Sequence, residues 1–88
     1  MSVSNRRKEE RYKGEGEVRL CFEDPTRQEV SGALLDYSNS GFRAAHKYCA
    51  LHAGQIVDFR HVIANGKARV MWNRIIEDRV ETGFLVLS

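Results

Sequence analysis

The chain lacks any long apolar run, and none of its 88 residues belongs to a stretch near the ~20 residues that a membrane-spanning helix needs. Its start, Met1 to Lys8, is polar and charged where a secretory signal peptide would have an apolar segment. Two cysteines, Cys21 and Cys49, are too few for the disulfide framework of a small secreted domain. We therefore expect a soluble protein of a reducing cytoplasm, with no membrane association.

An excess of one charge is also missing. Fourteen Lys and Arg residues face twelve Asp and Glu residues, and the net charge of +2 is too small to indicate bulk nucleic-acid binding. A domain of this size buries only about 60–65% of its unfolded surface, which leaves little room for a deep catalytic cleft. No Ser/His/Asp or paired-carboxylate arrangement stands out. The sequence therefore favours a binding module and not an enzyme.

Short alternating runs dominate the chain after residue 16. Val18, Leu20 and Phe22 alternate with polar residues, which is the period of a half-buried strand. Five further runs rich in β-branched or aromatic residues lie at 30–35, 42–47, 56–63, 67–72 and 81–87. No segment of ten residues or more has the period of an amphipathic helix. We predict an all-β fold, a six-stranded antiparallel β-barrel, because closure hides the sheet edges.

The segments between these runs carry their own expectations. Asn65-Gly66 is typical of a tight type I′ hairpin and predicts a turn there. Residues 73–80 are charged and predict a connection, and residues 48–54 predict a loop or one helical turn. Residues 1–16 are polar and end in two glycines, so they predict a flexible arm ahead of a single barrel domain at 17–88.

Two arginines of the arm, Arg7 and Arg11, lie four residues apart. This spacing keeps both on one side whether the arm is extended or helical. One interpretation is a solvated charge run that aids solubility. The other is a binding site for an anion with planar acceptors, because a guanidinium offers a rigid fork of donors suited to phosphate or to a guanine edge.

A second polar group, from Asp36 to Gly41, follows the end of a predicted strand. In one interpretation it is only a turn, in which Asp36 and Ser38 bond to the backbone and Gly41 supplies a positive φ. In the other, Asp36 accepts from the N1–H and exocyclic amine of a guanine and Ser38 adds a hydroxyl. Gly41 would then let the backbone approach the ligand closely. The residues alone leave both interpretations open.

The ordered pair of motifs, R-x-x-x-R at Arg7 and Arg11 and D-x-S-x-x-G at Asp36, Ser38 and Gly41, resembles the PilZ domain family. The runs V-R-L, G-F-R-A, A-R-V-M-W and G-F-L-V-L look like strands of that family, so the resemblance covers nearly the whole chain. It implies a six-stranded barrel that binds the bacterial second messenger cyclic di-GMP without turning it over. The arginine arm would wrap over the ligand, and the D-x-S-x-x-G turn would contact a guanine.

Three further residues are candidate ligand contacts. Arg43 either reaches the phosphates or is an ordinary exposed strand residue. Trp72 either packs in the core or at the barrel rim, or offers its face to a guanine, as in relatives that place a Trp near the ligand. Arg6 either pairs with Glu10 or is simply solvated, or it contacts the ligand: it directly precedes R-x-x-x-R and resembles the arrangement in members that bind two intercalated cyclic di-GMP molecules. On the second interpretation of Arg6, we expect two ligand molecules per chain.

His46, Cys49 and His52 form H-x-x-C-x-x-H, but they offer only three ligands, and a spacing of three alternates faces on a strand. We expect no metal and no cofactor. The predicted function is a cytoplasmic bacterial cyclic di-GMP receptor that acts through an unidentified protein partner and binds no DNA or RNA. One alternative is an adaptor of the same fold that needs no ligand. Another is a small single-stranded nucleic-acid-binding barrel, which the acidic residues of the arm disfavour.

Overall fold

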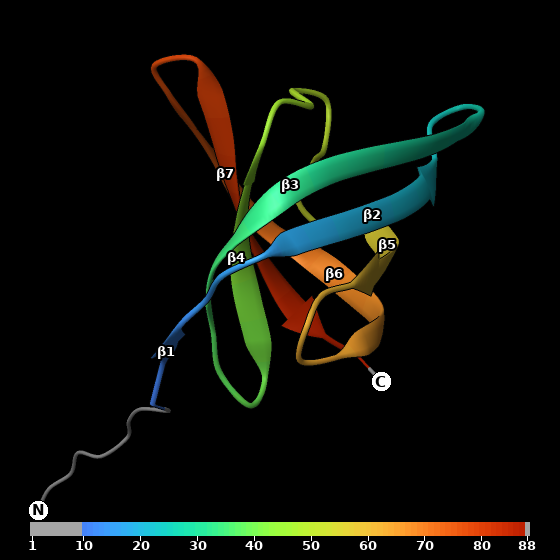
Figure 1. Ribbon diagram of the computed structural model, residues 1–88. Coiled ribbons are helices and arrows are strands. Elements are labelled where there is room, and N and C mark those ends of the chain that lie inside the picture. Colours follow the sequence, from blue (N-terminus) through green and yellow to red (C-terminus); the bar gives the residue numbers. More distant parts are fainter. Residues whose placement is uncertain (1–9, 88) are drawn as a thin grey trace, which may run out of the picture.

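The computed structural model describes residues 10–87, and all of their regular secondary structure is β-strand (Figure 1). The strands are β1 (Tyr12–Lys13), β2 (Glu17–Glu23), β3 (Arg27–Tyr37), β4 (Gly41–His46), β5 (Ile56–Arg60), β6 (Asn65–Ile76) and β7 (Arg79–Val86). They pair in the order β1-β3-β2-β5-β6-β7-β4, and β4 also pairs with β3. The predicted six-stranded antiparallel barrel is therefore confirmed, with β1 as an additional strand.

The end of the expected arm lies along β3. Tyr12 and Lys13 pair with the last two residues of β3, and the amide of Gly14 donates to the carbonyl of Leu35 at 2.9 Å. Residues 12–16 thus continue the β2–β3 ladder beyond the start of β2. Arg6 and Arg7 lie outside the described residues.

The core of the barrel comes from alternating side chains, as the sequence predicts for β2. Val18 and Leu20 are fully buried, and Phe22 is nearly so. The rings of Phe42 and Phe84 stack with centroids 4.6 Å apart. The buried cluster comprises Val18, Leu20, Phe22, Leu34, Phe42, Ala44, Leu51, Val57, Phe59, Ala68, Val70 and Phe84.

The hairpin between β5 and β6 turns earlier than predicted. Asn65 and Gly66 pair with the last two residues of β5, so the predicted turn at Asn65-Gly66 is wrong and the connection is residues 61–64. The reason is a side chain: Nδ1 of His61 accepts from the amides of Ile63 (3.2 Å) and Ala64 (3.3 Å). These hydrogen bonds stabilise a loop whose tip has no residues typical of turns.

The charged segment at 73–80 is also different from its prediction as a connection. β6 continues to Ile76, and β7 begins after the two-residue turn Glu77-Asp78, where Glu77 has a φ of 55°. Cross-strand polar contacts join the two strands, including Arg74 to Glu81 at 3.1 Å. The apolar alternation used to find strands is missing here because polar pairs replace it.

Residues 47–55 form a loop against the barrel, and Nδ2 of Asn73 donates to the carbonyl of Leu51 at 2.9 Å. Of the two expectations for residues 48–54, the loop is therefore the correct one. Within residues 10–87 there is no helix long and apolar enough to cross a membrane.

Candidate functional site

The strand β3 carries a β-bulge at Leu35. Leu34 pairs with Ala44 and Asp36 pairs with Arg43, which leaves Leu35 without a counterpart on β4. Since side chains alternate along a strand, Asp36 would share the inward face of Leu34 if β3 were regular at this point. The bulge instead places Asp36 on the outer surface of the barrel, beside Arg43.

The strand β6 carries a second bulge, at Met71. Val70 pairs with Phe84 and Trp72 pairs with Gly83, so Met71 is the extra residue. Val70 is fully buried, whereas Trp72 is 39% exposed. The bulge turns the indole out of the core, and the interpretation of Trp72 as a core residue is therefore wrong.

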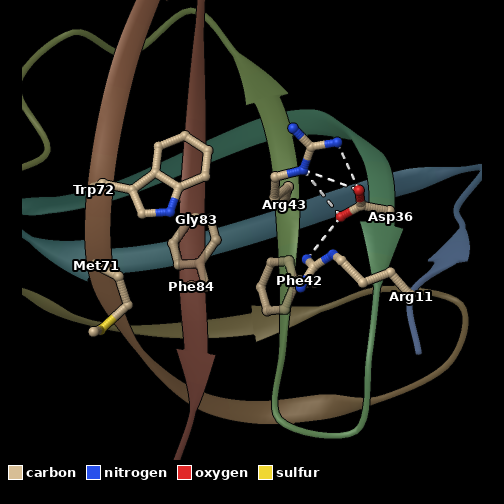
Figure 2. Close-up of a pocket in the computed structure, with 8 residues that line it drawn as sticks. All are labelled: Arg11, Asp36, Phe42, Arg43, Met71, Trp72, Gly83 and Phe84. Carbon is tan, nitrogen blue, oxygen red and sulfur yellow. Dashed lines mark hydrogen bonds and ion pairs between the residues drawn. The ribbon is translucent and has the colours of Figure 1, made fainter. Parts of the chain in front are cut away.

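These two bulges align four residues across adjacent strands. Asp36 on β3 pairs with Arg43 on β4, Arg43 pairs with Gly83 on β7, and Gly83 pairs with Trp72 on β6. A β-carbon on Gly83 would overlap the indole, so the glycine makes room for Trp72 to lie over β7. Figure 2 shows the indole beside Gly83 at one end of this row and Asp36 at the other.

An open pocket of about 370 Å³ lies over the row (Figure 2). It brings together four of the residues singled out in the sequence, which are Arg11, Asp36, Arg43 and Trp72. The other residues that line it are Phe42, Met71, Gly83 and Phe84. Sequence reasoning missed Met71 and Gly83, because their places depend on a bulge and on strand register. The G-F-L-V-L run did hold Gly83, but only as part of a strand.

Asp36 accepts hydrogen bonds from both arginines of the pocket. Arg43 donates from Nε to Oδ1 (3.1 Å) and Oδ2 (3.0 Å) and from Nη2 to Oδ2 (2.6 Å), and Arg11 donates from Nη2 to Oδ1 (2.8 Å). Burial acts to raise the pKa of Asp36, but the hydrogen bonds and charges of the two arginines outweigh it and lower the pKa. The hydrogen bonding between Arg43 and Asp36 also raises the pKa of Arg43. Asp36 is therefore a carboxylate at neutral pH.

Ser38 lies in the β3–β4 turn and Gly41 is the first residue of β4, and neither of them lines the pocket. The amide of Ser38 donates to the carbonyl of Gly41 at 2.8 Å, while the buried hydroxyl of Ser38 has no hydrogen-bond partner within residues 10–87. Gly41 is not among the described residues with positive φ, so the expectation that it supplies one is wrong. A β-carbon added at Gly41 would overlap the carbonyl of Phe84, so the glycine allows β4 and β7 to lie close together here.

Glu81, which sequence reasoning did not single out, is buried next to this row. Its Oε1 accepts from Nη2 of Arg74 at 3.1 Å and lies 3.9 Å from Nη1 of Arg43, and its Oε2 accepts from Nη2 of Arg79 at 2.7 Å. The hydrogen bonds from Arg74 and Arg79 lower the pKa of Glu81 despite its burial. The guanidinium carbon of Arg74 lies 5.9 Å from the centroid of Trp72. No sequence pattern could have found this buried acid among the charges at 73–81.

The H-x-x-C-x-x-H residues have separate surroundings. The buried imidazole of His46 accepts from the amide of Tyr48 through Nδ1 (3.1 Å) and bonds the hydroxyl of Thr82 through Nε2 (2.7 Å). Cys49 and His52 are exposed. Among residues 10–87, no three or more His, Cys, Asp or Glu side chains cluster in a way that could hold a metal ion.

A scan of protein-family models found none that matches the chain, and a search of curated proteins found no significant match.

Proposed function

We propose that the chain is a cytoplasmic bacterial receptor of the PilZ type, which binds cyclic di-GMP and signals through a protein partner. The observation that carries the proposal is the pocket itself. It holds an arginine of the R-x-x-x-R motif against the aspartate of the D-x-S-x-x-G motif, although the two are 25 positions apart in the chain. An exposed indole, Trp72, lies at the other end of the same row.

This composition suits a guanine nucleotide. Guanine presents two neighbouring donors, N1–H and the exocyclic amine, and the carboxylate of Asp36 can accept both. Trp72 offers a flat apolar surface, and stacking of a base on such a surface contributes about 1–3 kcal/mol. Arg11 and Arg43 supply the guanidiniums that bind phosphate oxygens.

The hydrogen bonds of Asp36 also suggest how binding reaches the arm. A carboxylate has roughly four lone-pair positions. Three N–H groups, Nη2 of Arg11 and Nε and Nη2 of Arg43, already donate to Asp36, and a guanine edge would bring two more. A guanine that bonds Asp36 therefore displaces a guanidinium. Arg11 donates to Asp36 from one nitrogen and Arg43 donates from two, so Arg11 is the one to move. Its release would rearrange the segment that precedes β1 and change the surface offered to a partner.

The direct test is calorimetric titration of the protein with cyclic di-GMP. Cyclic di-AMP and a single-stranded oligodeoxynucleotide are the control ligands, since adenine has a bare N1 acceptor where guanine has a proton. We expect binding of cyclic di-GMP, with Arg7→Ala and Arg11→Ala each weakening it about 10–150-fold. Arg27→Ala, which changes an exposed arginine at the far end of β3, serves as the matched control.

Absence of binding would overturn the receptor assignment and favour the ligand-independent adaptor. Equal binding of cyclic di-AMP would overturn the assignment of guanine to Asp36. Binding of the oligonucleotide alone would favour the nucleic-acid-binding barrel.

We further propose two ligand molecules per chain, on the grounds of charge. Around the pocket, Arg11, Arg43, Arg74 and Arg79 face two carboxylates, Asp36 and Glu81, and so leave two positive charges, which balance the two phosphodiesters of one cyclic di-GMP. Arg6 and Arg7 of the arm would supply two further positive charges, which match the two phosphodiesters of a second ligand. Mass spectrometry of the native complex should show two ligands, and Arg6→Leu should shift the ratio toward one. A wild-type ratio of one would overturn the pairing and leave the receptor assignment intact.

A further inference from the structure

Arg74 occupies the outer face of β6 beside the indole. It follows Trp72 by two residues, so both side chains leave the strand on the same side. Its guanidinium carbon is 5.9 Å from the indole centroid, within the range of a cation–π contact. The Arg74 side chain is 59% exposed, although the carboxylate that it bonds, on Glu81, is 7% exposed. Glu81 thus fixes the position of the Arg74 side chain, while much of that side chain stays accessible to solvent.

The anchoring leaves most of the guanidinium available. Within residues 10–87, Arg74 donates one hydrogen bond, from Nη2 to Oε1 of Glu81. A guanidinium carries five N–H donors, so four remain for another acceptor. Arg79, in contrast, bonds the other oxygen of Glu81 at 2.7 Å. The two oxygens of Glu81 therefore hold separate arginines, and Oε1 is the one that faces Arg74 and Arg43.

Glu81 also lets two positive groups lie close together. Its Oε1 is 3.1 Å from Nη2 of Arg74 and 3.9 Å from Nη1 of Arg43, so one oxygen lies between the two guanidiniums. Without this charge they would repel each other across the outer face of β7. Because the arginines lower the pKa of Glu81, the carboxylate is charged at neutral pH and this arrangement is present there.

We propose that Arg74, which lies beside Trp72 at the edge of the pocket, binds a phosphate of the ligand, and that Glu81 is the positioning residue that holds Arg74 beside Trp72. The inference rests on the proposed function. In a nucleotide, only the sugar separates base from phosphate, so a base that lies against Trp72 brings an anion close to the indole. Arg74 is the guanidinium beside that ring, and it offers its free donors to the anion.

The test uses the one tryptophan of the chain as the reporter. Cyclic di-GMP is titrated into the full-length protein, and the Trp72 fluorescence and the calorimetric heat are recorded at low and high salt. Arg74→Gln should weaken binding about tenfold or more, and it should reduce the salt dependence, because one charge–charge contact is lost. Arg69→Gln is the matched control: it removes an exposed arginine of the same strand that lies opposite Ile56 and Leu85, away from the Trp72–Gly83 and Arg74–Glu81 pairs. This control should bind as the wild type does.

A double-mutant cycle separates the role of Glu81 from a general loss of structure. Glu81→Gln should weaken binding, and the double variant with Arg74→Gln should lose less than the sum of the two single losses, because Glu81 acts in part through Arg74. Wild-type affinity in Arg74→Gln, or an equal loss in Arg69→Gln, would overturn the proposal while the receptor assignment stands. If Glu81→Gln does not fold, the exposed Arg74→Gln variant alone decides the matter. Absence of binding by the wild-type protein would overturn the proposed function itself, and the role of Arg74 with it.

Discussion

The two sides of the barrel differ in how regular their strands are. β2 and β5 alternate between buried and exposed residues without interruption. β3 and β6 each interrupt the alternation once, at Leu35 and Met71. The regular strands supply the core, whereas each interruption moves one side chain, Asp36 or Trp72, from the inside to the pocket. In this molecule, regular strands provide stability and irregular strands provide the candidate site.

The largest effect should come from the regular side. Leu20 on β2 is fully buried, and Leu20→Ala should lower the free energy of unfolding by about 2–5 kcal/mol because it removes apolar burial and leaves a cavity. Urea denaturation measures the change. The exposed neighbour Arg19→Ala is the control and should change stability little. The folded fraction of Leu20→Ala should bind the ligand with wild-type affinity. A loss of affinity in that folded fraction would contradict the assignment of stability to the regular strands and of binding to the irregular ones.

Asp36 tests the first bulge. Asp36→Asn turns one acceptor into a donor that faces the donors of guanine, and it should weaken cyclic di-GMP binding about 10–150-fold. Asp58→Asn is the matched control, because Asp58 is an exposed, lysine-paired aspartate on the regular strand β5. Calorimetry should show a loss only for Asp36. Equal affinities for both variants would remove Asp36 from the site.

Trp72 tests the second bulge. Trp72→Leu keeps an apolar side chain but removes the aromatic face, and it should weaken binding by about 1–3 kcal/mol, the contribution of stacking one base. Ile75→Ala changes another exposed apolar residue of β6 and serves as the control. Denaturation curves of Trp72→Leu should stay close to wild type, since the indole is outside the core. A large loss of stability would instead assign Trp72 a packing role.

The smallest effect should appear in the pH dependence of stability. Burial lowers the pKa of His46 and of His61, so the folded protein resists protonating them. Unfolded histidine titrates near about pH 6.5, and stability should therefore fall as the pH drops below that value. Urea midpoints between about pH 7.5 and pH 5 measure the slope. His46→Asn should flatten it, whereas His52→Gln, at an exposed position, should not.

The sequence was sufficient for the fold because the buried strands follow an alternation that a single chain shows directly. Val18, Leu20 and Phe22 illustrate this, since each was expected to be inward and each is buried. Strand ends were harder, because a histidine side chain decides the β5–β6 turn and cross-strand arginine–glutamate pairs extend β6 and β7. Neither effect depends on local apolar pattern.

The pocket was predictable only in part. Arg11, Asp36, Arg43 and Trp72 were found through motif and residue type, and all four line it. Gly83 and Glu81 were not found, because their importance comes from register: Gly83 lies opposite Trp72, and Glu81 lies opposite Arg74. The register depends on how two strands pair, so the residue pattern of one strand does not show it.

The row from Asp36 to Trp72 has a fixed length. It crosses β3, β4, β7 and β6, so its ends are separated by three strand spacings of about 4.8 Å, or roughly 14 Å along the curved surface. The backbone hydrogen bonds between the strands set this length. A substitution in the row therefore changes the chemistry at one position without changing the distance between the positions. A single mononucleotide could engage one end at a time. A ligand with two bases could engage both, so the barrel would select its ligand by length as well as by hydrogen bonding.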